Sequence, residues 1–364
     1  MFKLNYLRNV AILMAMTISI TNNNVEACTG IGMQAEDGSK VIARTMEWGT
    51  FVLEAKYSVV PRGYTQTALT PTGTNGLKFT AKYGYAGISA LEDRFVVEGL
   101  NEKGLVAELF YFPNYGKCED YDPANNATTI TDVQLIPWML GNFATIEEME
   151  KEIGKLHIIP YGHGFDNVHW NVGDRTGRQV VIEIINKEVK IFENEIEVIT
   201  NAPSFDWQMT NLNNYVNIFA GSAPTHELVP GVTLRPFGIG SASLGLPGDL
   251  TPPSRFVRAA FYKLTARPQK DGEGTVLQAF QILNNFDVPV GAEFSDPQQA
   301  PEFLSATQWT AAVDLMNLKF YYKTEWNYTI RCIDLSKIDF SKVKFQSWPL
   351  DKVKKQPIEY IPVK

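Results

Sequence analysis

The beginning of the chain indicates which residue becomes the first residue of the folded protein. Lys3 and Arg8 precede an apolar run at residues 10–20, and a polar stretch that ends at Ala27 follows it. A basic start, a short apolar run and a small residue at the end are typical of a secretory signal peptide. The run has about eleven residues, whereas about twenty are needed to span a bilayer. We therefore expect residues 1–27 to be removed during export, which leaves Cys28 at the amino terminus of a periplasmic or secreted protein.

The residues Val25-Glu-Ala-Cys28 also resemble the signal at which a lipoprotein is cut and lipidated on its cysteine. Plain cleavage leaves a free thiol and a free amine on Cys28, and a catalyst can use both groups. Lipidation would block them and would leave an anchored protein that binds ligands or partners without catalysis. The polar spacer and the acidic Glu26 favour plain cleavage, because lipoprotein signals place small residues around a cysteine that directly follows the apolar run.

Charge and cysteine content narrow the function further. The chain has 33 Lys and Arg against 40 Asp and Glu, a net charge of −7, so no general attraction to nucleic acid or to an anionic membrane is expected. No other apolar run has the length of a membrane span. Three cysteines cannot all pair within one chain, so at least one thiol is free. If that thiol belongs to Cys28, Cys118 and Cys332 are either free or bonded to each other.

Residue patterns predict one α+β domain over residues 28–364. Two strand patterns, at 28–34 and 40–48, flank Glu36-Asp-Gly-Ser39, whose Asp-Gly pair favours a hairpin turn. A capping box, Thr145-Ile-Glu-Glu148, indicates the start of a helix. Further strands are expected at 94–100, 105–112, 168–172, 179–185, 189–192 and 196–200, helices at 205–219, 254–265 and 275–283, and β-rich sequence at 308–340. Residues 221–253 are interpreted as an ordered loop.

A cysteine at the amino terminus can supply both groups that a nucleophilic catalyst needs. Its thiol attacks carbonyl carbons once it is ionised. Its α-amino group, with a pKa of about 7.7 to 8.0, belongs to the same residue and can take up the proton. We expect no cofactor and no metal site. His157, His163 and His169 recur at equal spacing, but the glycines and the proline between them break any helix that would align them as ligands.

Five sequence blocks together resemble one known family. They follow one another along the chain as Cys28-Thr-Gly-Ile-Gly, Arg44-Thr-Met-Glu-Trp48, Asn101-Glu-Lys-Gly-Leu105, Thr200-Asn-Ala-Pro203 with Phe205-Asp-Trp, and Gly245-Leu-Pro-Gly-Asp249 with Pro253-Ser-Arg-Phe-Val-Arg258. They are similar to the choloylglycine hydrolase family of N-terminal-nucleophile hydrolases, which holds bile salt hydrolases and penicillin V acylases. The resemblance implies a four-layer αββα sandwich of two antiparallel sheets between helix layers. It also implies a bacterial host and hydrolysis of a linear amide through a thioester acyl-enzyme.

The resemblance implies roles for three residues near the amino terminus. Cys28 matches the nucleophile, and Arg44 matches an arginine beside the thiol, where a guanidinium favours the thiolate. Glu47 stands where the family usually has the aspartate that hydrogen-bonds the α-amine, and it is one methylene longer. The ordinary alternatives are a surface arginine and a solvated strand glutamate.

Three more residues match later blocks of the family. Asn201 matches the side chain that stabilises the oxyanion. Arg255 matches the second active-site arginine, whereas Arg258, one helical turn later, is expected to serve packing or ion pairs. Tyr111 stands at an oxyanion-hole position, where its backbone N–H would be the donor. Many bile salt hydrolases have asparagine there and penicillin V acylases have tyrosine, although an aromatic residue facing the core is the ordinary alternative.

The sequence therefore predicts an exported amidohydrolase that acts on a small-molecule amide. Glycine- or taurine-conjugated bile salts are the favoured substrates, and penicillin V or N-acyl homoserine lactones are the alternatives within the same mechanism. A papain-type protease is disfavoured, because the chain lacks the Cys-Gly-Ser-Cys-Trp pattern. Family members can use the region of residues 221–253 for subunit contacts, so a homo-oligomer, such as a tetramer, is one expected assembly.

Overall fold

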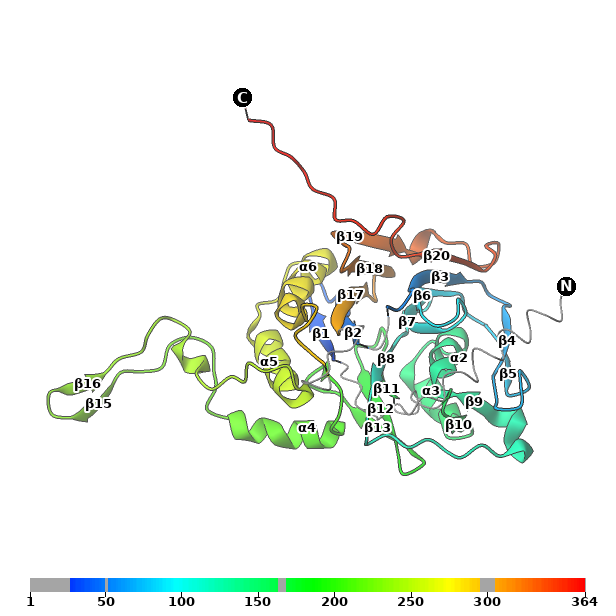
Figure 1. Ribbon diagram of the computed structural model, residues 1–364, viewed down its shortest axis with the longest axis horizontal. Helices are drawn as coiled ribbons and strands as arrows, with labels where there is room; N and C mark the ends of the chain where they lie inside the picture. Colours follow the sequence, from blue (N-terminus) through cyan, green and yellow to red (C-terminus); the bar gives the residue numbers. More distant parts are fainter. Residues whose placement is uncertain (1–26, 50–51, 163–167, 295–304, 364) are drawn as a thin grey trace.

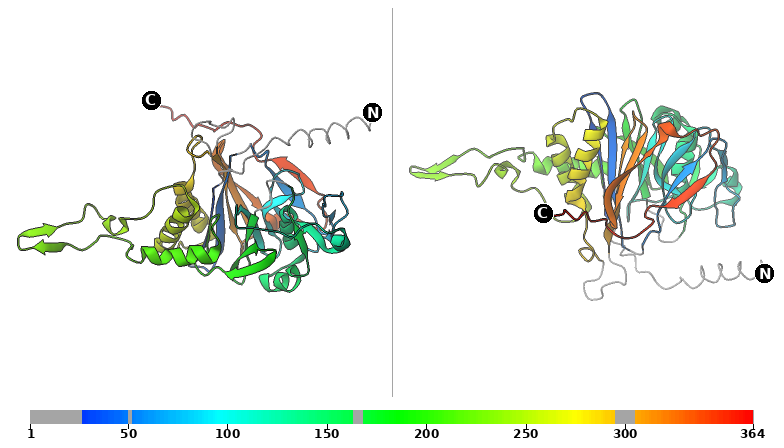
Figure 2. Two further views of the ribbon diagram at one scale, coloured as in Figure 1. Left: turned by 60° about the horizontal axis from the view of Figure 1, so that its bottom comes forward. Right: turned by 90° about the horizontal axis from the view of Figure 1, so that it is seen from above.

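Two β-sheets stack face to face, and helices cover their outer faces (Figure 1, Figure 2). The structure, a computed structural model, describes residues 27–49, 52–162, 168–294 and 305–363. Residues 1–26 of the expected signal peptide (residues 1–27) lie outside these ranges, as does His163. In the part of the chain that is described, no helix has the length and apolar character needed to cross a membrane. The fold is an α+β sandwich of the αββα type.

The first sheet, which we call sheet A, has six strands in the order β14-β1-β2-β17-β18-β19, and neighbouring strands are antiparallel. The hairpin predicted from the sequence is confirmed, and Gly38 adopts a φ of 87° at its turn, which favours glycine. The strands are β1 (Cys28–Gln34), β2 (Lys40–Trp48), β14 (Val198–Ile199), β17 (Ala306–Asp314), β18 (Lys319–Thr324) and β19 (Asn327–Asp334). Segments from both ends of the chain therefore meet in sheet A.

The second sheet, sheet B, has eight antiparallel strands in the order β13-β12-β11-β8-β7-β6-β3-β20. Of the six strands predicted between residues 94 and 200 as one antiparallel meander, five occupy the first five of these positions. The sixth, predicted at 196–200, is instead β14 of sheet A, because it pairs with β1. The strands are β3 (Lys56–Val60), β6 (Tyr85–Ser89), β7 (Val96–Asn101), β8 (Val106–Tyr111), β11 (Val168–Gly173), β12 (Gln179–Ile185), β13 (Glu188–Glu193) and β20 (Gln346–Pro349). Small two-stranded pairs are formed by β4 (Thr65–Thr67) with β5 (Lys78–Thr80) and by β9 (Thr129–Thr131) with β10 (His157–Ile159).

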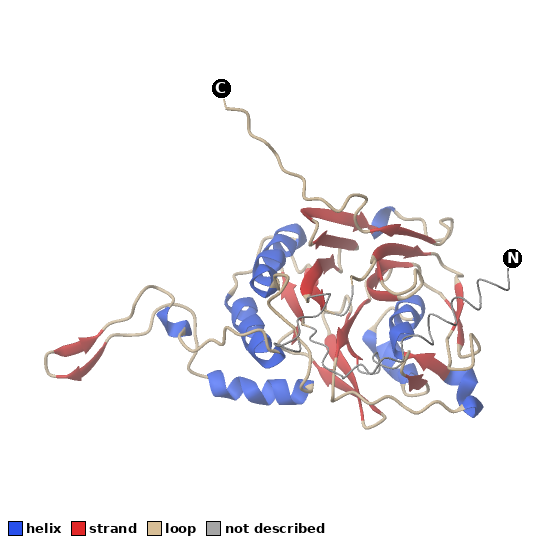
Figure 3. Ribbon diagram, viewed as in Figure 1, coloured by secondary structure: helices blue, strands red, loops and turns tan. Residues whose placement is uncertain are grey.

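Helices form the two outer layers (Figure 3). On sheet A, α5 (Pro252–Thr265) packs on β1, α6 (Gly272–Leu283) packs on β1, β2 and β17, and α4 (Phe205–Asn211) lies against α5. On sheet B, α2 (Leu135–Asn142) packs on β7 and β8, and α3 (Ile146–Ile153) follows it. The helix start predicted at Thr145 is confirmed, because its side chain accepts a hydrogen bond from the backbone N–H of Glu148 at 3.3 Å.

The structure differs from the sequence prediction in several elements. The strands without a counterpart in the prediction include β3, β4, β5, β6, β9, β10 and β20. Helix α2 has no counterpart in the prediction, because its residues are almost all apolar and give no helical period. The helix expected at 205–219 ends at Asn211 and is followed by a 3₁₀ turn up to Tyr215. The region 221–253, expected to be a loop, contains a hairpin of β15 (His226–Val229) and β16 (Val232–Leu234).

Residues 216–250 form an arm that extends away from the sandwich (Figure 1, Figure 2). The arm follows α4 and returns to the body at α5. Several of its apolar side chains are almost fully exposed, among them Val216, Phe237, Ile239 and Leu244. A single copy of the chain does not bury these side chains.

None of the three cysteines forms a disulfide within the part of the chain that the structure describes. Cys28 and Cys118 are buried and Cys332 is exposed. Cys118 and Cys332, for which the sequence left a mutual disulfide open, are not joined by one.

Candidate active site

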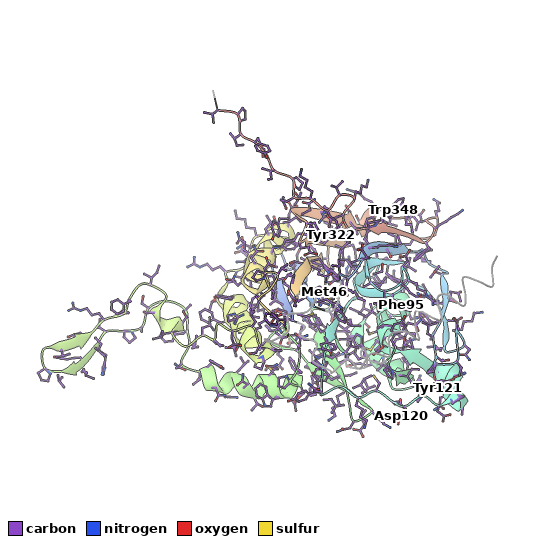
Figure 4. The ribbon with its side chains drawn as sticks, in the orientation of Figure 1. Met46, Phe95, Asp120, Tyr121, Tyr322 and Trp348 are labelled. Atoms are coloured by element: carbon purple, nitrogen blue, oxygen red, sulfur yellow. The ribbon has the colours of Figure 1, made fainter. Side chains whose placement is uncertain are left out.

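Cys28 is the first residue of β1, and its side chain lies between the two sheets. In the β1–β2 ladder, Cys28 pairs with Met46 and Gly30 pairs with Arg44. Because alternate residues of a strand share a face, these four positions lie on the inner face of sheet A. Figure 4 labels Met46 on β2, between helices α5 and α6 on one side and sheet B on the other. Cys28 is therefore buried, and only 2% of the residue is exposed.

Gly30 allows the two sheets to approach each other beside the thiol. A Cβ atom at this position would lie 2.8 Å from the ring of Phe110 and 2.7 Å from Ile199, closer than real side chains allow. Without that atom, the Phe110 ring reaches sheet A, and the guanidinium of Arg44 lies 4.1 Å above the ring centroid. The sequence therefore has glycine at this position because the aromatic platform under Arg44 needs the space.

Arg44 is fully buried and is held on several sides. Its Nε donates to the carbonyl of Thr45 at 3.1 Å, and its Nη1 donates to the carbonyl of Leu109. Its Nη2 lies 3.6 Å from Met46 Sδ, and this sulfur lies 4.0 Å from Cys28 Sγ. The Met46 sulfur thus contacts both the guanidinium and the thiol, and the sequence alone gave no indication of this contact.

Opposing effects act on the ionisation of the thiol. Burial raises the pKa of the Cys28 thiol, and the carboxyl group of Glu47 adds to this effect. The charges of Arg44 and Arg255 and the backbone N–H of Glu47 lower the pKa, although burial prevails. The surroundings of Cys28 are therefore cationic but dry, so the thiolate depends on these two arginines.

A second group of polar side chains occupies the other face of β1 and β2, toward the helices. Glu47 accepts hydrogen bonds from Thr45 at 3.0 Å and from Thr307 of β17 at 2.5 Å. Burial raises the pKa of Glu47 to about 8, against the effect of these bonds and of the nearby arginines. Glu47 was expected to bind the amine of Cys28. In the chain that still carries Ala27, the Cys28 nitrogen instead donates to Asn201 Oδ1 at 2.8 Å.

Asn201 connects three parts of the site. Its Oδ1 accepts from the Cys28 nitrogen and, at 2.7 Å, from Nη2 of Arg255. Its Nδ2 donates to the carbonyl of Tyr111 at 2.8 Å, which leaves the second N–H of this amide group available. The residue follows β14, the edge strand beside β1, so sheet pairing brings it to Cys28 across 173 residues of sequence.

The two arginines of α5 have different surroundings. Arg255 is buried and donates through Nη1 to the carbonyl of Cys28 and, at 2.9 Å, to the hydroxyl of Thr29. Arg258 donates to the carbonyls of Pro247 and Asp249 and thus braces the end of the arm. The structure brings Arg255, and not Arg258, to the candidate nucleophile.

A pocket lies beside Cys28. Its wall is mostly apolar and includes Met46, Trp48, Leu109 and Tyr111. The rings of Trp48 and Tyr111 meet edge to face, with centroids 6.2 Å apart. A mostly apolar wall next to a thiol suits a substrate with an apolar acyl group.

Comparison with known proteins assigns the chain to a family. Residues 28–347 match the linear amide C–N hydrolases of the choloylglycine hydrolase type. The chain belongs to the choloylglycine hydrolase family. It is 30% identical over 325 residues to a bile salt hydrolase/transferase of Clostridium perfringens, a match that covers 87% of this chain and 95% of that protein.

Two further comparisons extend this result. A penicillin V acylase of Pectobacterium atrosepticum is 25% identical over 327 residues, covering 83% of this chain and 78% of that protein. The crystal structure of a mutant conjugated bile acid hydrolase from Clostridium perfringens superimposes with a TM-score of 0.78 at 28% identity. That match covers 92% of this chain and all of the crystal chain. Members of the choloylglycine hydrolase family hydrolyse linear amides, so the chain is an amide hydrolase.

The structure brings together all six candidate site residues that were chosen from the sequence. The other five either contact Cys28 or contact a neighbour of it. Tyr111 contributes its carbonyl oxygen and its ring, whereas the expected role of its N–H as an oxyanion donor stays a prediction. No group of three or more metal-ligating side chains occurs within the described ranges. His157 lies 2.9 Å from Glu119, and His169 contacts Glu183 and the carbonyl of Thr200.

Sequence reasoning missed several residues of the site. Thr45 and Met46 lie inside a block that was recognised, and the alternation along β2 could have assigned them to opposite faces. Glu98 and Glu108 lie in the middle of strands that were predicted, where a buried carboxylate is unusual and is itself a signal. Thr307 gave no signal, because only the pairing of β17 with β2 brings it to Glu47.

Proposed function

We propose that this chain is an exported bacterial amidohydrolase in which Cys28, freed by removal of residues 1–27, hydrolyses glycine- or taurine-conjugated bile salts. The observation that carries the proposal is the position of Cys28. Its thiol borders an apolar pocket, and its backbone nitrogen and carbonyl are held by Asn201 and Arg255. The match to the family begins at the same residue, and a similar protein of Clostridium perfringens is named a bile salt hydrolase/transferase.

The first step of the proposed reaction acylates the enzyme. The Cys28 thiol passes its proton to the free α-amine, and the sulfur forms a bond to the carbonyl carbon of the substrate. The carbonyl oxygen becomes negative, and the second N–H of Asn201 Nδ2 is the donor that stabilises it. The protonated amine then gives its proton to the leaving nitrogen, the C–N bond breaks, and a thioester remains.

The second step releases the acid. Water attacks the thioester carbonyl while the α-amine takes its proton, and the oxyanion forms at the same donors. The bond between carbon and sulfur then breaks, and the thiolate of Cys28 takes back the proton. Arg44 lowers the pKa of this thiol, so it stabilises the leaving sulfur as well as the attacking one.

Removal of the leader is part of this proposal. While Ala27 is attached, the Cys28 nitrogen belongs to an amide and cannot act as a base. Ala27 is itself buried, so its removal also vacates space next to the nucleophile. The alternative of a lipoprotein carrying a diacylglyceryl group on Cys28 is disfavoured by the polar spacer and the acidic Glu26 that precede the cysteine.

Penicillin V is the second candidate substrate within the same mechanism, and N-acyl homoserine lactones are the third. Tyr111 favours penicillin V, because penicillin V acylases of this family have tyrosine at the matching position, and its ring forms part of the pocket wall beside Trp48. A similar protein of Pectobacterium atrosepticum is named a penicillin V acylase. The bile salt assignment is preferred because similarity to that acylase is lower, 25% against 30% identity.

We also propose that the chain assembles into a homo-oligomer, such as a tetramer, through the arm of residues 216–250. A protein surface rarely leaves a contiguous group of large apolar side chains in water. The arm carries such a group and does not fold back onto its own sandwich. A second copy of the chain offers the same apolar side chains, so two arms can cover each other.

A substrate panel tests the proposed reaction. The purified mature protein is assayed with glycocholate, taurocholate, penicillin V and an N-acyl homoserine lactone. We expect the highest kcat/KM for the bile salts, and we expect Cys28→Ser to lower it by about 1,000-fold or more. Cys332→Ser, which changes an exposed free thiol, is the control and should keep full activity. Equal activity in Cys28→Ser would overturn the assignment of Cys28 as the nucleophile. A higher kcat/KM for penicillin V would make penicillin V, and not a bile salt, the proposed substrate.

A further inference from the structure

Two buried glutamates of sheet B face the guanidinium of Arg44. Glu98 of β7 and Glu108 of β8 are direct cross-strand partners, and each is 1% exposed. Glu98 Oε2 lies 3.7 Å from Arg44 Nε. No described residue donates a hydrogen bond to that oxygen. The reaction described above uses neither carboxyl group.

The other contacts of the two glutamates come from uncharged donors. Trp309 of β17 donates through Nε1 to Glu98 Oε1. Asn171 of β11 pairs across the strand with Glu108 and donates to its Oε2 at 2.8 Å. Helix α2, which covers the opposite face of β7 and β8, has no charged residue. Among the described residues, Arg44 of β2 is the charged group of sheet A that acts on the pair, and the Cys28 thiol of β1 in turn interacts with Arg44.

Four potential anions share one buried cation in this arrangement, because Glu47 on the other face of β2 also interacts favourably with the charge of Arg44. The Cys28 thiolate, Glu98 and Glu108 all interact favourably with the charge of Arg44. Two ionised carboxylates directly opposite each other on neighbouring strands repel each other, and burial disfavours both charges. Burial accordingly raises the pKa of Glu98, and burial together with the neighbouring Glu98 raises the pKa of Glu108 to about 7, against the effect of Arg44.

We propose that Glu98 and Glu108 act as a pair of positioning residues that hold Arg44 from the facing sheet and compete with the Cys28 thiolate for its positive charge. When the pair is ionised, the charge of Arg44 is largely balanced by carboxylate and the thiolate is less stabilised. When the pair takes up a proton, more of that charge is available to the sulfur. This inference rests on the proposed role of Cys28 and adds a control of its reactivity.

The test measures the reactivity of the thiol directly and not only the hydrolysis. Mature wild type, Glu108→Gln and Glu98→Gln are alkylated with iodoacetamide over a range of pH, and mass spectrometry measures the rate at the peptide that begins with Cys28. The exposed Cys332, alkylated in the same tube, reports on reagent and pH. Glu197→Gln is the matched control, because Glu197 is a partly buried glutamate whose ion pairs are with Lys40 and Lys263.

Both pair variants are expected to lower the apparent pKa of the Cys28 thiol by about one pH unit, which is about tenfold faster alkylation on the acid side. The acid limb of kcat/KM should move to lower pH by the same amount, and Glu197→Gln should leave both profiles unchanged. A purely structural role predicts the opposite sign, because a loosened Arg44 stabilises the thiolate less and raises the pKa.

An unchanged or raised pKa of the Cys28 thiol in Glu108→Gln overturns the proposed role of the pair. A lowered thiol pKa in only one of the two variants, when both fold, also overturns it. If Glu98→Gln does not fold, Glu108→Gln decides alone, since it leaves the contact between Arg44 and Glu98 in place. Failure of the proposed function is a separate result. In that case Cys28→Ser keeps its hydrolytic activity, whatever the alkylation profile of the pair variants.

Discussion

At the scale of single residues, the alternation along β2 separates two kinds of surroundings. Arg44 and Met46 face the interior between the sheets, where they meet the thiol of Cys28. Thr45 and Glu47 face the helices, where they meet Arg255 and Thr307. Charged groups therefore lie on both sides of one strand. The interior groups act on the sulfur of Cys28, and the groups on the helix side act on its backbone.

Asn201 is the residue whose loss should separate binding from chemistry. We expect Asn201→Ala to lower kcat by about 100- to 1,000-fold, because the variant lacks the proposed oxyanion donor, and to change KM little. Steady-state kinetics with the best substrate of the panel measures both constants. Asn194→Ala is the control, since it removes another buried asparagine whose hydrogen bonds are to Val198. A rise in KM at unchanged kcat would mean that Asn201 only binds substrate.

Individual residues also mark the limit of sequence reasoning. Arg255 and Arg258 differ by one helical turn, and the family pattern was enough to choose the one that contacts Cys28. The partners of Glu47 could not be predicted, because Thr307 lies 260 residues away and reaches it only through strand pairing. The longer glutamate was recognised as a departure from the family, but its hydrogen bonds had to come from the structure.

At the scale of elements, local signals predicted the strands that hold Cys28, the candidate nucleophile. The Asp-Gly turn and the flanking alternation gave β1 and β2 with the bounds that the structure has. Helix α2 was missed because a helix that is apolar on all sides has no period to detect. Strands β15 and β16 were missed because they pair only with each other and bury little, so their composition resembles that of a loop.

The arm is an element with a separate test. Replacing the exposed Phe237 and Ile239 with aspartate should convert the proposed oligomer to a monomer, because each change places a charge in the apolar contact. Size-exclusion chromatography with light scattering measures the mass. Val353→Asp, at an exposed position of the carboxy-terminal segment, is the control and should leave the mass unchanged. A monomeric wild type would contradict the proposed assembly, as would an oligomer that survives both changes.

At the scale of the whole molecule, the two sheets bring distant segments of the chain to one site. Sheet A joins strands from residues 28–48 to strands from residues 306–334, and sheet B ends with β20 beside β3. Local patterns predicted the α+β class and most strands, but they contain no information on which strands pair across 260 residues. The sandwich was therefore expected from resemblance to a family, and the structure and the comparisons confirm it.

The central claim is that the mature chain begins at Cys28 and that this residue carries the acyl group. The most direct test is the intact mass of the exported protein, measured alone and after rapid mixing with glycocholate and quenching in acid. We predict the mass of unmodified residues 28–364, and after mixing a transient gain equal to the cholyl group, located on the peptide that begins with Cys28. A mass that retains residues 1–27, a diacylglyceryl group on Cys28, or an acyl group on another residue would contradict the account.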